Sequence, residues 1–381
     1  MSTTNSRGCL LLVVPLLVVA CADSTGPSDE HEIVEVQAGS QNTCALMRSG
    51  QLWCWGIPVG ESGQNVEPLP VQYDPTLDVD HFALARFGSS LCVTSGDATS
   101  CQGAWLAYDV GSPYGTNLDE RVPIQTSAAL DQVSTYAGHT CGVEPDGTAI
   151  CWGGALFGRR GQGVPEDLNG SIIPNVVAGG HHFLSVSAGY LHSCGVTEEQ
   201  SVLCWGAADY LGAPDAEVLE GPDACFFQDF GCTWAPVPVA LTNVSSLSAS
   251  GMTCAVSNGQ VYCWDHETVI PTLVPIPRAI EAVTTVSTRA CALADDGSAW
   301  CWGLPGPGLG HAGQDGLPGR VETSLRFIQL STGSDHSCGV TEDHELYCWG
   351  ANHAGELGNG QQNTGSASPV QVLFPWVSTT N

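Results

Sequence analysis

The most constraining feature of this 381-residue sequence is a short segment with two cysteines nine or ten residues apart, which recurs seven times. Residues 332–360 read TGSDHSCGVTEDHELYCWGANHAGELGNG, and residues 137–163 repeat the pattern as AGHTCGVEPDGTAICWGGALFGRRGQG. The first cysteines of the seven copies are Cys44, Cys92, Cys141, Cys194, Cys254, Cys291 and Cys338, which gives a mean period of 49 residues. A period of this size is typical of architectures in which each repeat packs on its neighbours.

Each copy is predicted to be a β-hairpin whose register the cysteines fix. Where the cysteines are ten residues apart, the turn has three residues, as in Pro145-Asp146-Gly147, with Gly in the left-handed position. Where they are nine apart, the turn shortens to two residues, as in Asn258-Gly259 and Gly96-Asp97. Because spacing and turn length change together, the two cysteines are expected to face each other, about 4.5 to 5.5 Å apart at Cα, as a disulfide allows.

Cysteine counting predicts eight local disulfides. Of the 18 cysteines, Cys9 and Cys21 fall in the first 21 residues, which leaves an even number suited to an oxidising compartment. No CxxC pair occurs, so a zinc ribbon is not expected. The predicted pairs are Cys44 with Cys54, Cys92 with Cys101, Cys141 with Cys151, Cys194 with Cys204, Cys225 with Cys232, Cys254 with Cys263, Cys291 with Cys301 and Cys338 with Cys348.

Two further β segments flank each hairpin, for example residues 327–330 before it and residues 369–372 after it. The 46 Gly and 23 Pro, with only 13% charged residues, favour strands and turns over long surface helices. Four strands per copy predict an all-β fold, a single seven-bladed β-propeller of four-stranded antiparallel blades over residues 33–381, with an intrablade disulfide in each hairpin. How the ring closes is open, with residues 374–377 as a candidate sealing strand.

Residues 349–360, WGANHAGELGNG, resemble a nearly complete copy of the regulator of chromosome condensation repeat, whose blades show G-x-x-H-[TS]-x-A-L and then W-G-x-N-x-x-G-[QE]-L-G-x-G. The resemblance covers about residues 33–373 and implies the propeller. Departures are the missing Trp of the second copy, Asp265 in place of Gly in the fifth, and the added cysteines, which resemble those of bacterial exported members. The nuclear protein's roles, nucleotide exchange on the Ran GTPase and chromatin binding, are not expected of an exported chain.

The first thirty residues predict export. Arg7 precedes an apolar run over residues 10–20, which is too short to span a bilayer as a helix. Residues 18–21, VVAC, resemble a bacterial lipobox, so residues 1–20 are predicted as a lipoprotein signal peptide. Cys21 would then carry the lipid and residues 21–32 would form a polar tether on the bacterial cell envelope, at the inner or the outer membrane. The alternative is an ordinary secretory signal cleaved nearby.

The net charge of the chain limits the classes of partner that it can bind. The chain has 39 Asp and Glu against 10 cations, all of them Arg, and a net charge of -29. Phosphate contacts need clustered basic residues, so a nucleic-acid interface of the usual kind is excluded. A partner is expected to be basic or bridged by cations.

The sequence holds no catalytic signature and no cofactor or metal motif. His139, His192 and His336 share one repeat position, before Ser or Thr and Cys, but other copies carry Asn42, Met252 and Arg289 there. A structural hydrogen-bonding role is therefore favoured over a metal site. No catalytic or cofactor-binding residue is proposed.

Insertions after the third strands of two blades are the candidate partner-binding loops, because function tends to lie on loops over a rigid scaffold. The fourth copy has an insertion over residues 207–236, which the pair of Cys225 and Cys232 clips. Both insertions should open on the same face of the ring, with the aromatics either exposed or folded onto their own blade. The candidate residues are Phe226, Phe227, Asp229, Phe230 and Trp234 in the fourth copy, and Trp105, Tyr108 and Tyr114 in the second. Acidic neighbours in the fourth copy are Asp215, Glu217, Glu220 and Asp223.

Two functions follow from these observations. The first is an envelope-anchored, non-catalytic scaffold that binds a protein or glycan through loops on one propeller face. The second is an envelope hydrolase that uses acidic residues near the central channel. A deep channel with convergent carboxylates would favour the hydrolase, and a face with exposed aromatics would favour binding.

Overall fold

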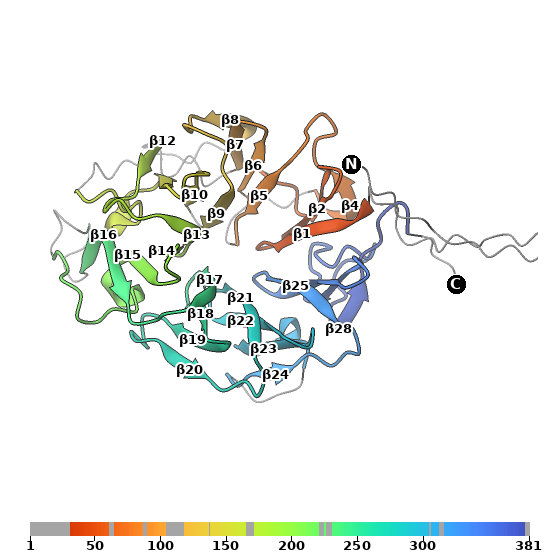
Figure 1. Cartoon of the computed structure of the whole chain (residues 1–381). Coiled ribbons are helices and arrows are strands. Elements are labelled where there is room, and N and C mark those ends of the chain that lie inside the picture. Colours follow the sequence, from red (N-terminus) through yellow and green to blue (C-terminus); the bar gives the residue numbers. More distant parts are fainter. Residues whose placement is uncertain are drawn as a thin grey trace, which may run out of the picture.

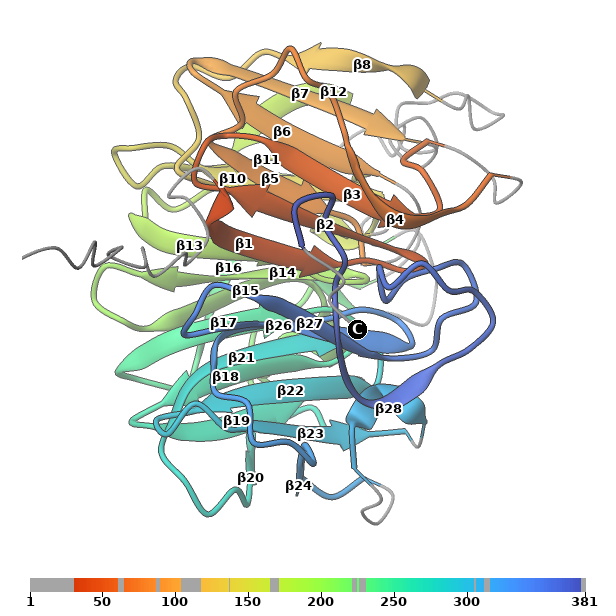
Figure 2. The same ribbon diagram turned by 90° about the vertical axis from the view of Figure 1, so that its right-hand side faces the viewer.

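The computed structural model describes residues 31–60, 65–86, 90–103, 118–136, 138–164, 171–220, 225, 231–304, 306–311 and 316–377. These residues fold into seven four-stranded antiparallel sheets arranged as the blades of a ring (Figure 1). From the side, the strands run between the two faces of the ring (Figure 2). The predicted seven-bladed propeller is confirmed.

Each blade is a meander of four consecutive strands. The first strands, nearest the axis, are β1 (Ile33–Ala38), β5 (His81–Leu84), β9 (Gln132–Tyr136), β13 (Phe183–Ala188), β17 (Val244–Ala249), β21 (Ile280–Val286) and β25 (Phe327–Thr332). The second strands are β2 (Asn42–Met47), β6 (Leu91–Ser95), β10 (His139–Val143), β14 (His192–Thr197), β18 (Thr253–Ser257), β22 (Arg289–Ala294) and β26 (His336–Thr341). The third strands are β3 (Leu52–Gly56), β7 (Ala98–Gly103), β11 (Ala149–Gly153), β15 (Val202–Ala207), β19 (Gln260–Trp264), β23 (Ala299–Gly303) and β27 (Leu346–Gly350). The outer strands are β4 (Glu67–Gln72), β8 (Leu118–Ile124), β12 (Ser171–Val176), β16 (Cys232–Val239), β20 (Thr272–Val274), β24 (Gly319–Arg320) and β28 (Ser366–Gln371).

Hairpin registers match the cysteine spacing. In the second and third strands of every blade the two cysteines are direct partners across the ladder. In the nine-residue spacing of the fifth blade, Ser257 pairs with Gln260 around Asn258-Gly259, both of which have positive φ. In the ten-residue spacing of the third blade, Gly147 takes the left-handed conformation that closes the three-residue turn.

A disulfide closes the hairpin of every blade, as the fold prediction required. The seven bridges join Cys44 with Cys54, Cys92 with Cys101, Cys141 with Cys151, Cys194 with Cys204, Cys254 with Cys263, Cys291 with Cys301 and Cys338 with Cys348. Their Cα atoms are 4.0 to 4.1 Å apart, which is closer than the expected 4.5 to 5.5 Å, because the bridge draws the two strands together. Cys54 is partly buried and the other bridging cysteines are at most 8% exposed, so the bridges belong to the core and not to a binding surface.

The core lies between blades, not within them. Hydrophobic clusters join residues of adjacent sheets, and Trp55, Trp152, Trp205, Trp264 and Trp349 are among the largest fully buried side chains. A single sheet with two apolar faces needs a neighbour on each side, so the blades are stable only as a ring.

The ring closes without a shared strand, since the first blade is β1 to β4 and the last is β25 to β28. Residues 374–377 form no strand, so the expected sealing strand is absent. Phe374 instead packs edge-on against Trp53 and Trp55, at centroid distances of 6.2 and 6.0 Å, and stacks on Trp376 at 4.9 Å. Pro375 breaks the backbone pattern there, so the tail closes the ring by aromatic packing and not by pairing.

No helix in the described ranges has the length and hydrophobicity needed to cross a bilayer. The predicted signal peptide, residues 1–20, and the lipid attachment site Cys21 lie outside the described residues and stay predictions.

Candidate partner-binding face

Hydrogen bonds at the repeated histidine position join one blade to the next. His139 Nε2 lies 2.8 Å from Ser193 Oγ, His192 Nε2 2.6 Å from Thr253 Oγ1, and His336 Nε2 2.7 Å from Thr43 Oγ1. In each case the hydroxyl belongs to the following blade, on the residue before its first cysteine. The structural role that the sequence favoured for these histidines is therefore what the geometry shows.

The same hydroxyl and a tryptophan both donate hydrogen bonds to one loop carbonyl of the preceding blade. Ser193 Oγ and Trp205 Nε1 both donate to the Arg159 carbonyl oxygen, each at 2.9 Å. Because the hydroxyl proton points to that carbonyl, the hydroxyl accepts from the Nε2–H of His139. We call this set of histidine, hydroxyl, tryptophan and carbonyl the blade clasp.

Burial sets the ionisation of the clasp histidines. All three imidazoles are fully buried, and desolvation lowers the pKa of His139 well below its usual value, that of His192 to about 3 and that of His336 to about 4. All three are neutral at physiological pH. No cluster of three or more metal-ligating side chains occurs among the described residues.

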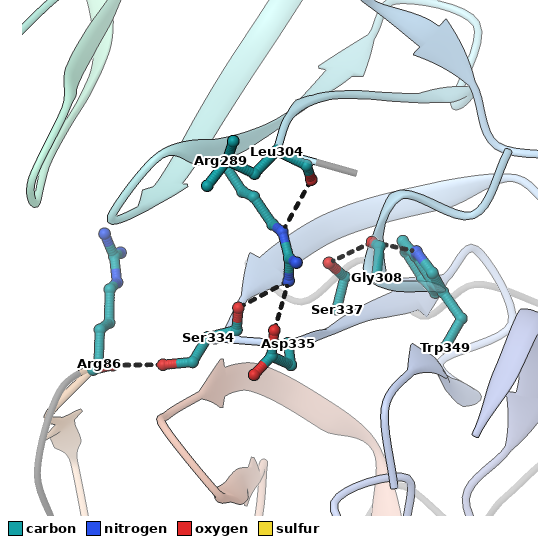
Figure 3. Close-up of polar contacts among 8 residues, drawn as sticks. All are labelled: Arg86, Arg289, Leu304, Gly308, Ser334, Asp335, Ser337 and Trp349. Carbon is teal, nitrogen blue, oxygen red and sulfur yellow. Dashed lines mark hydrogen bonds and ion pairs between the residues drawn. The ribbon is translucent and has the colours of Figure 1, made fainter. Parts of the chain in front are cut away.

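The sixth blade uses an arginine in the histidine position (Figure 3). The guanidinium of Arg289 donates to the Ser334 carbonyl and to Asp335 Oδ1, each at 2.8 Å, and to the Leu304 carbonyl at 3.1 Å. Ser337 and Trp349 still grip a loop carbonyl, that of Gly308. An ion pair thus replaces the imidazole at this joint.

The joint between the fifth and sixth blades has neither the histidine nor the hydroxyl. Met252 stands in the histidine position and Ala290 of the sixth blade stands in the hydroxyl position. Both are apolar, and both pack in the hydrophobic cluster between β18 and β21. This joint therefore lacks the histidine-to-hydroxyl bond of the blade clasp.

The central channel is a polar cavity of about 260 Å³ lined by the first strands of all seven blades. Side-chain oxygens of one first strand accept backbone N–H groups of the next, which ties the strands around the axis. These bonds run from Val36 to Gln329, Ala38 to Ser331, Leu84 to Gln37, Val186 to Gln132, Ala188 to Ser134, Ala249 to Ser187 and Val283 to Ser246.

Two carboxylates and one buried guanidinium line this channel. Burial raises the pKa of Glu35 to about 7, and its Oε1 accepts from Gln37, a member of the strand-to-strand ladder. Asp131 comes from the third blade. Arg86 donates to Ser248 Oγ at 2.7 Å and to the Thr285 carbonyl at 2.8 Å. Arg86 thus links the second blade to the fifth and sixth, whereas the Glu35 carboxylate bonds to Gln37 of its own strand. Glu35 and Asp131 come from the first and third blades.

An aromatic pocket of about 280 Å³ opens on the face that carries the loops after the third strands. Tyr136 at the end of β9, Tyr190 in the β13–β14 turn and Tyr210 in the 3₁₀ turn η3 (Ala208–Tyr210) form its walls. Asp265 and His266, directly after β19, complete it. The Tyr136 and Tyr190 rings meet at 6.5 Å in an edge-on contact, and Tyr210 stacks with His266 at 5.7 Å.

The blade clasp holds the pocket wall in place. The Tyr210 ring stacks on His192 at 5.3 Å, and its carbonyl accepts from Trp264 Nε1 at 3.0 Å. Tyr190 is 46% exposed, whereas Tyr136 is buried behind it. Burial raises the pKa of Tyr136 and of Tyr210, so both phenols are neutral at physiological pH. The pocket is aromatic and accessible, which is the usual character of a binding site.

Asp265 lies in the pocket because it departs from the repeat. Six other blades have Gly at this position with φ between 91° and 128°, a conformation that Asp tolerates poorly. Asp265 does not have a positive φ, so the backbone after β19 follows a different path from that of the other blades. Its Oδ1 accepts from the backbone N–H groups of Glu267 and Thr268, at 2.9 and 2.7 Å, which fixes the carboxylate.

The predicted insertion in the fourth blade is partly buried. Cys225 and Cys232 form a disulfide with Cα atoms 5.8 Å apart, and both are fully buried beside Ala207 and Phe157. Trp234 is only 3% exposed in the same cluster, so its assignment to a partner surface was wrong. The reason is packing between blades, since the buried cluster around Trp234 includes Phe157 of the third blade.

The remaining candidates, Phe226, Phe227, Asp229, Phe230, Trp105, Tyr108 and Tyr114, lie outside the described residues and stay predictions. Of the acidic neighbours, Asp215, Glu217 and Glu220 are exposed. Sequence reasoning missed Tyr136, Tyr190 and Tyr210 as site residues. The one sequence signal that indicates the pocket is Asp265, which departs from the Gly of the other repeats.

Comparison with known proteins gives one repeat family. The family model for the regulator of chromosome condensation (RCC1) repeat matches residues 33–64, 183–210 and 327–356. The Ultraviolet-B receptor UVR8 of Arabidopsis thaliana is 28% identical over 208 residues, 50% of this chain and 45% of that protein. The human E3 ubiquitin-protein ligase HERC2 is 25% identical over 194 residues, 47% of this chain and 4% of that protein. The matches span less than half of either relative.

Solved structures share the propeller. Human WBSCR16 superposes with a TM-score of 0.70 and 17% identity, covering 86% of this chain and 95% of that one. Prp20p from Saccharomyces cerevisiae, whose structure was reported with its binding properties to Gsp1p and histones, gives 0.69 and 15%, covering 91% of this chain and 88% of that one. At these identities the likeness shows the fold alone.

Proposed function

Because the chain is a propeller of regulator of chromosome condensation repeats, we propose that it is a non-catalytic scaffold that binds a protein partner at the cell envelope. The propeller suggests a binding or regulatory scaffold, since this repeat fold is typically non-catalytic. The lipobox-like residues 18–21 support anchoring through Cys21, and the disulfide in every blade supports an oxidising compartment.

The observation that carries this proposal is the aromatic pocket on the face of the third-strand loops. Tyrosines from the third and fourth blades converge there, at a place where the repeat pattern requires no aromatic. Tyr side chains combine large contact area with a polar end and few rotamers, which makes them frequent interface anchors. Yeast Prp20p, whose structures were reported with its binding properties to Gsp1p and histones and with Kap60 bound, supports a protein as the partner class here.

The hydrolase alternative has no comparable support. Its best candidate, Glu35, has a raised pKa, as a general acid would. However, its carboxylate is hydrogen-bonded within the ladder that joins first strands, and Asp131 stands two blades away in the ring.

Capture from the native envelope with matched variants tests the proposal. We expect the wild-type chain to retain one partner protein, and Tyr190→Ala with Tyr210→Ala to lose at least tenfold of that retention while Tyr347→Ala, on the seventh blade, retains it. Cys21→Ala should move the chain from the membrane to the soluble fraction. Equal retention by the pocket variant and wild type would refute the binding face, and unchanged fractionation of Cys21→Ala would refute the anchor.

A further inference from the structure

A second cavity meets the aromatic pocket at Asp265. It is a groove of about 240 Å³ between the fifth and sixth blades, lined by Met252, Leu273, Trp302 and Leu317 among others. Asp265 lines both cavities, so the pocket and the groove are neighbours that share one carboxylate. Leu273 and Leu317 are 46% and 52% exposed, which leaves the groove with an apolar rim.

The groove lies at one of the joints without the histidine-to-hydroxyl bond. At three other joints a buried imidazole bonds to a hydroxyl of the next blade, and at a fourth Arg289 pairs with Asp335. Here Met252 and Ala290 place apolar side chains in the same two positions. The outer strands beside it are short, with three residues in β20 and two in β24. The local sequence thus explains both why the groove exists and why it is apolar.

The pocket has the chemistry of a cation site. The half-exposed ring of Tyr190 carries negative quadrupole charge on its faces, and the fixed carboxylate of Asp265 adds a full negative charge. Among the described residues, no cationic side chain forms an ion pair with Asp265. Arg86 acts on Tyr136 electrostatically, but its guanidinium donates to groups inside the channel.

We propose, as an extension of the proposed binding function, that these two cavities bind an extended segment of the partner protein, with a Lys or Arg side chain in the pocket and apolar neighbours in the groove. A protein net charge of -29 attracts such a basic segment. The groove decides between a peptide and a free amine, because a small amine leaves the apolar surface beside Asp265 uncovered.

Binding of short peptides to the full chain, measured by fluorescence anisotropy, tests this assignment. The probe is an extended hexapeptide with one Lys flanked by leucines, and its control has Gln in place of Lys. We expect the Lys peptide to bind at least tenfold more tightly than the Gln peptide, with an affinity that falls as salt is added.

Two variants separate the parts of the site. Asp265→Asn should weaken the Lys peptide at least tenfold, and Leu317→Asp should weaken it similarly by placing charge on the apolar rim. Asp97→Asn in the β6–β7 turn and Leu69→Asp on β4 are matched exposed controls that should bind as wild type does. Leu317 is exposed, so thermal unfolding should show that its variant remains folded.

Three outcomes would overturn the inference. The first is equal binding of the Lys and Gln peptides, or no binding of either. The second is tetramethylammonium competing fully with the peptide while Leu317→Asp has no effect, which would assign the pocket to a small amine. The third is envelope capture that is lost in the Tyr190 and Tyr210 variant but intact in Asp265→Asn and Leu317→Asp, which would leave the binding function standing without a basic segment.

Discussion

Three buried histidines show how one residue type fixes a repeat architecture. Each imidazole hydrogen-bonds through Nε2 to a hydroxyl of the next blade, and its Nδ1 is buried with no hydrogen-bond partner among the described residues. Protonation would place a positive charge where solvent does not reach it, and of the three sites only that of His336 has a carboxylate, Asp335, acting on it. The blade clasp therefore stabilises the contact between blades only while its histidines are neutral.

This arrangement predicts acid sensitivity at the residue scale. The folded-state pKa of each clasp histidine lies below the unfolded value of 6.5, so the unfolded chain binds more protons in that window. The stabilisation is complete above pH 6.5 and is lost as the pH falls toward about 4 for His336 and about 3 for His192. Glu35 acts oppositely, since its raised pKa stabilises the fold below pH 4.5 and this is lost as the pH rises through about 7.

Thermal unfolding between pH 7 and pH 5 checks the prediction, because most shifted carboxylates contribute only below that window. We expect the wild-type midpoint to fall as the pH falls, and His192→Asn to be less stable at pH 7 but to show a shallower decline. Asn is the residue that the first blade carries at the corresponding position, Asn42. His266→Asn, at an exposed histidine, is the control. An identical slope in wild type and His192→Asn would show that the clasp does not titrate.

At the scale of elements, the hairpins were predictable and the pocket was not. Cysteine spacing reports which residues face each other, and the turn residues between them set the same register, so the two signals agree in the third and fifth blades alike. The pocket instead combines Tyr136, Tyr190, Tyr210 and Asp265 from three blades. Their side chains meet only after the ring forms, and no spacing along the sequence encodes that meeting. The prediction that Trp234 is exposed was wrong for the same reason, because it packs in a cluster with Phe157 of another blade.

Disulfides within hairpins predict local effects on stability. Replacing both Cys254 and Cys263 with Ala removes a bridge that closes about ten residues, which should lower the free energy of unfolding by roughly 2 to 3 kcal/mol. Because the bridge lies within one blade, the loss of amide protection should concentrate in β18 and β19. Denaturant unfolding and hydrogen exchange measure the two effects, and the Cys291 and Cys301 pair is the matched control, whose loss should move the effect to β22 and β23. Equal loss of protection in all blades would contradict this view.

The whole molecule depends on how its two ends meet. In a propeller whose first and last blades share no strand, the joint between these two blades is the one that no covalent connection crosses. The blades are therefore expected to separate there first. Here the His336 bond to Thr43 and the bonds from β25 to β1 span the joint. The C-terminal tail adds Trp376, which packs on Trp53 at 5.1 Å and stacks on His31 at 4.2 Å. Both ends of the described chain thus reinforce the joint where Figure 1 shows β1 beside β25.

Ring closure is therefore predicted to rest heavily on Phe374, which is 4% exposed and touches both tryptophans of β3. Phe374→Ala should lower the free energy of unfolding by about 3 to 5 kcal/mol, the usual cost of deleting a buried phenyl ring. The first exchange-labile amides should then appear in β1 and β25, the strands that face each other across the joint. Val377→Ala, three residues on and only half-buried, is the control and should cost far less. A change below about 1 kcal/mol for Phe374→Ala would mean that the His336 clasp and the first-strand bonds close the ring without the tail.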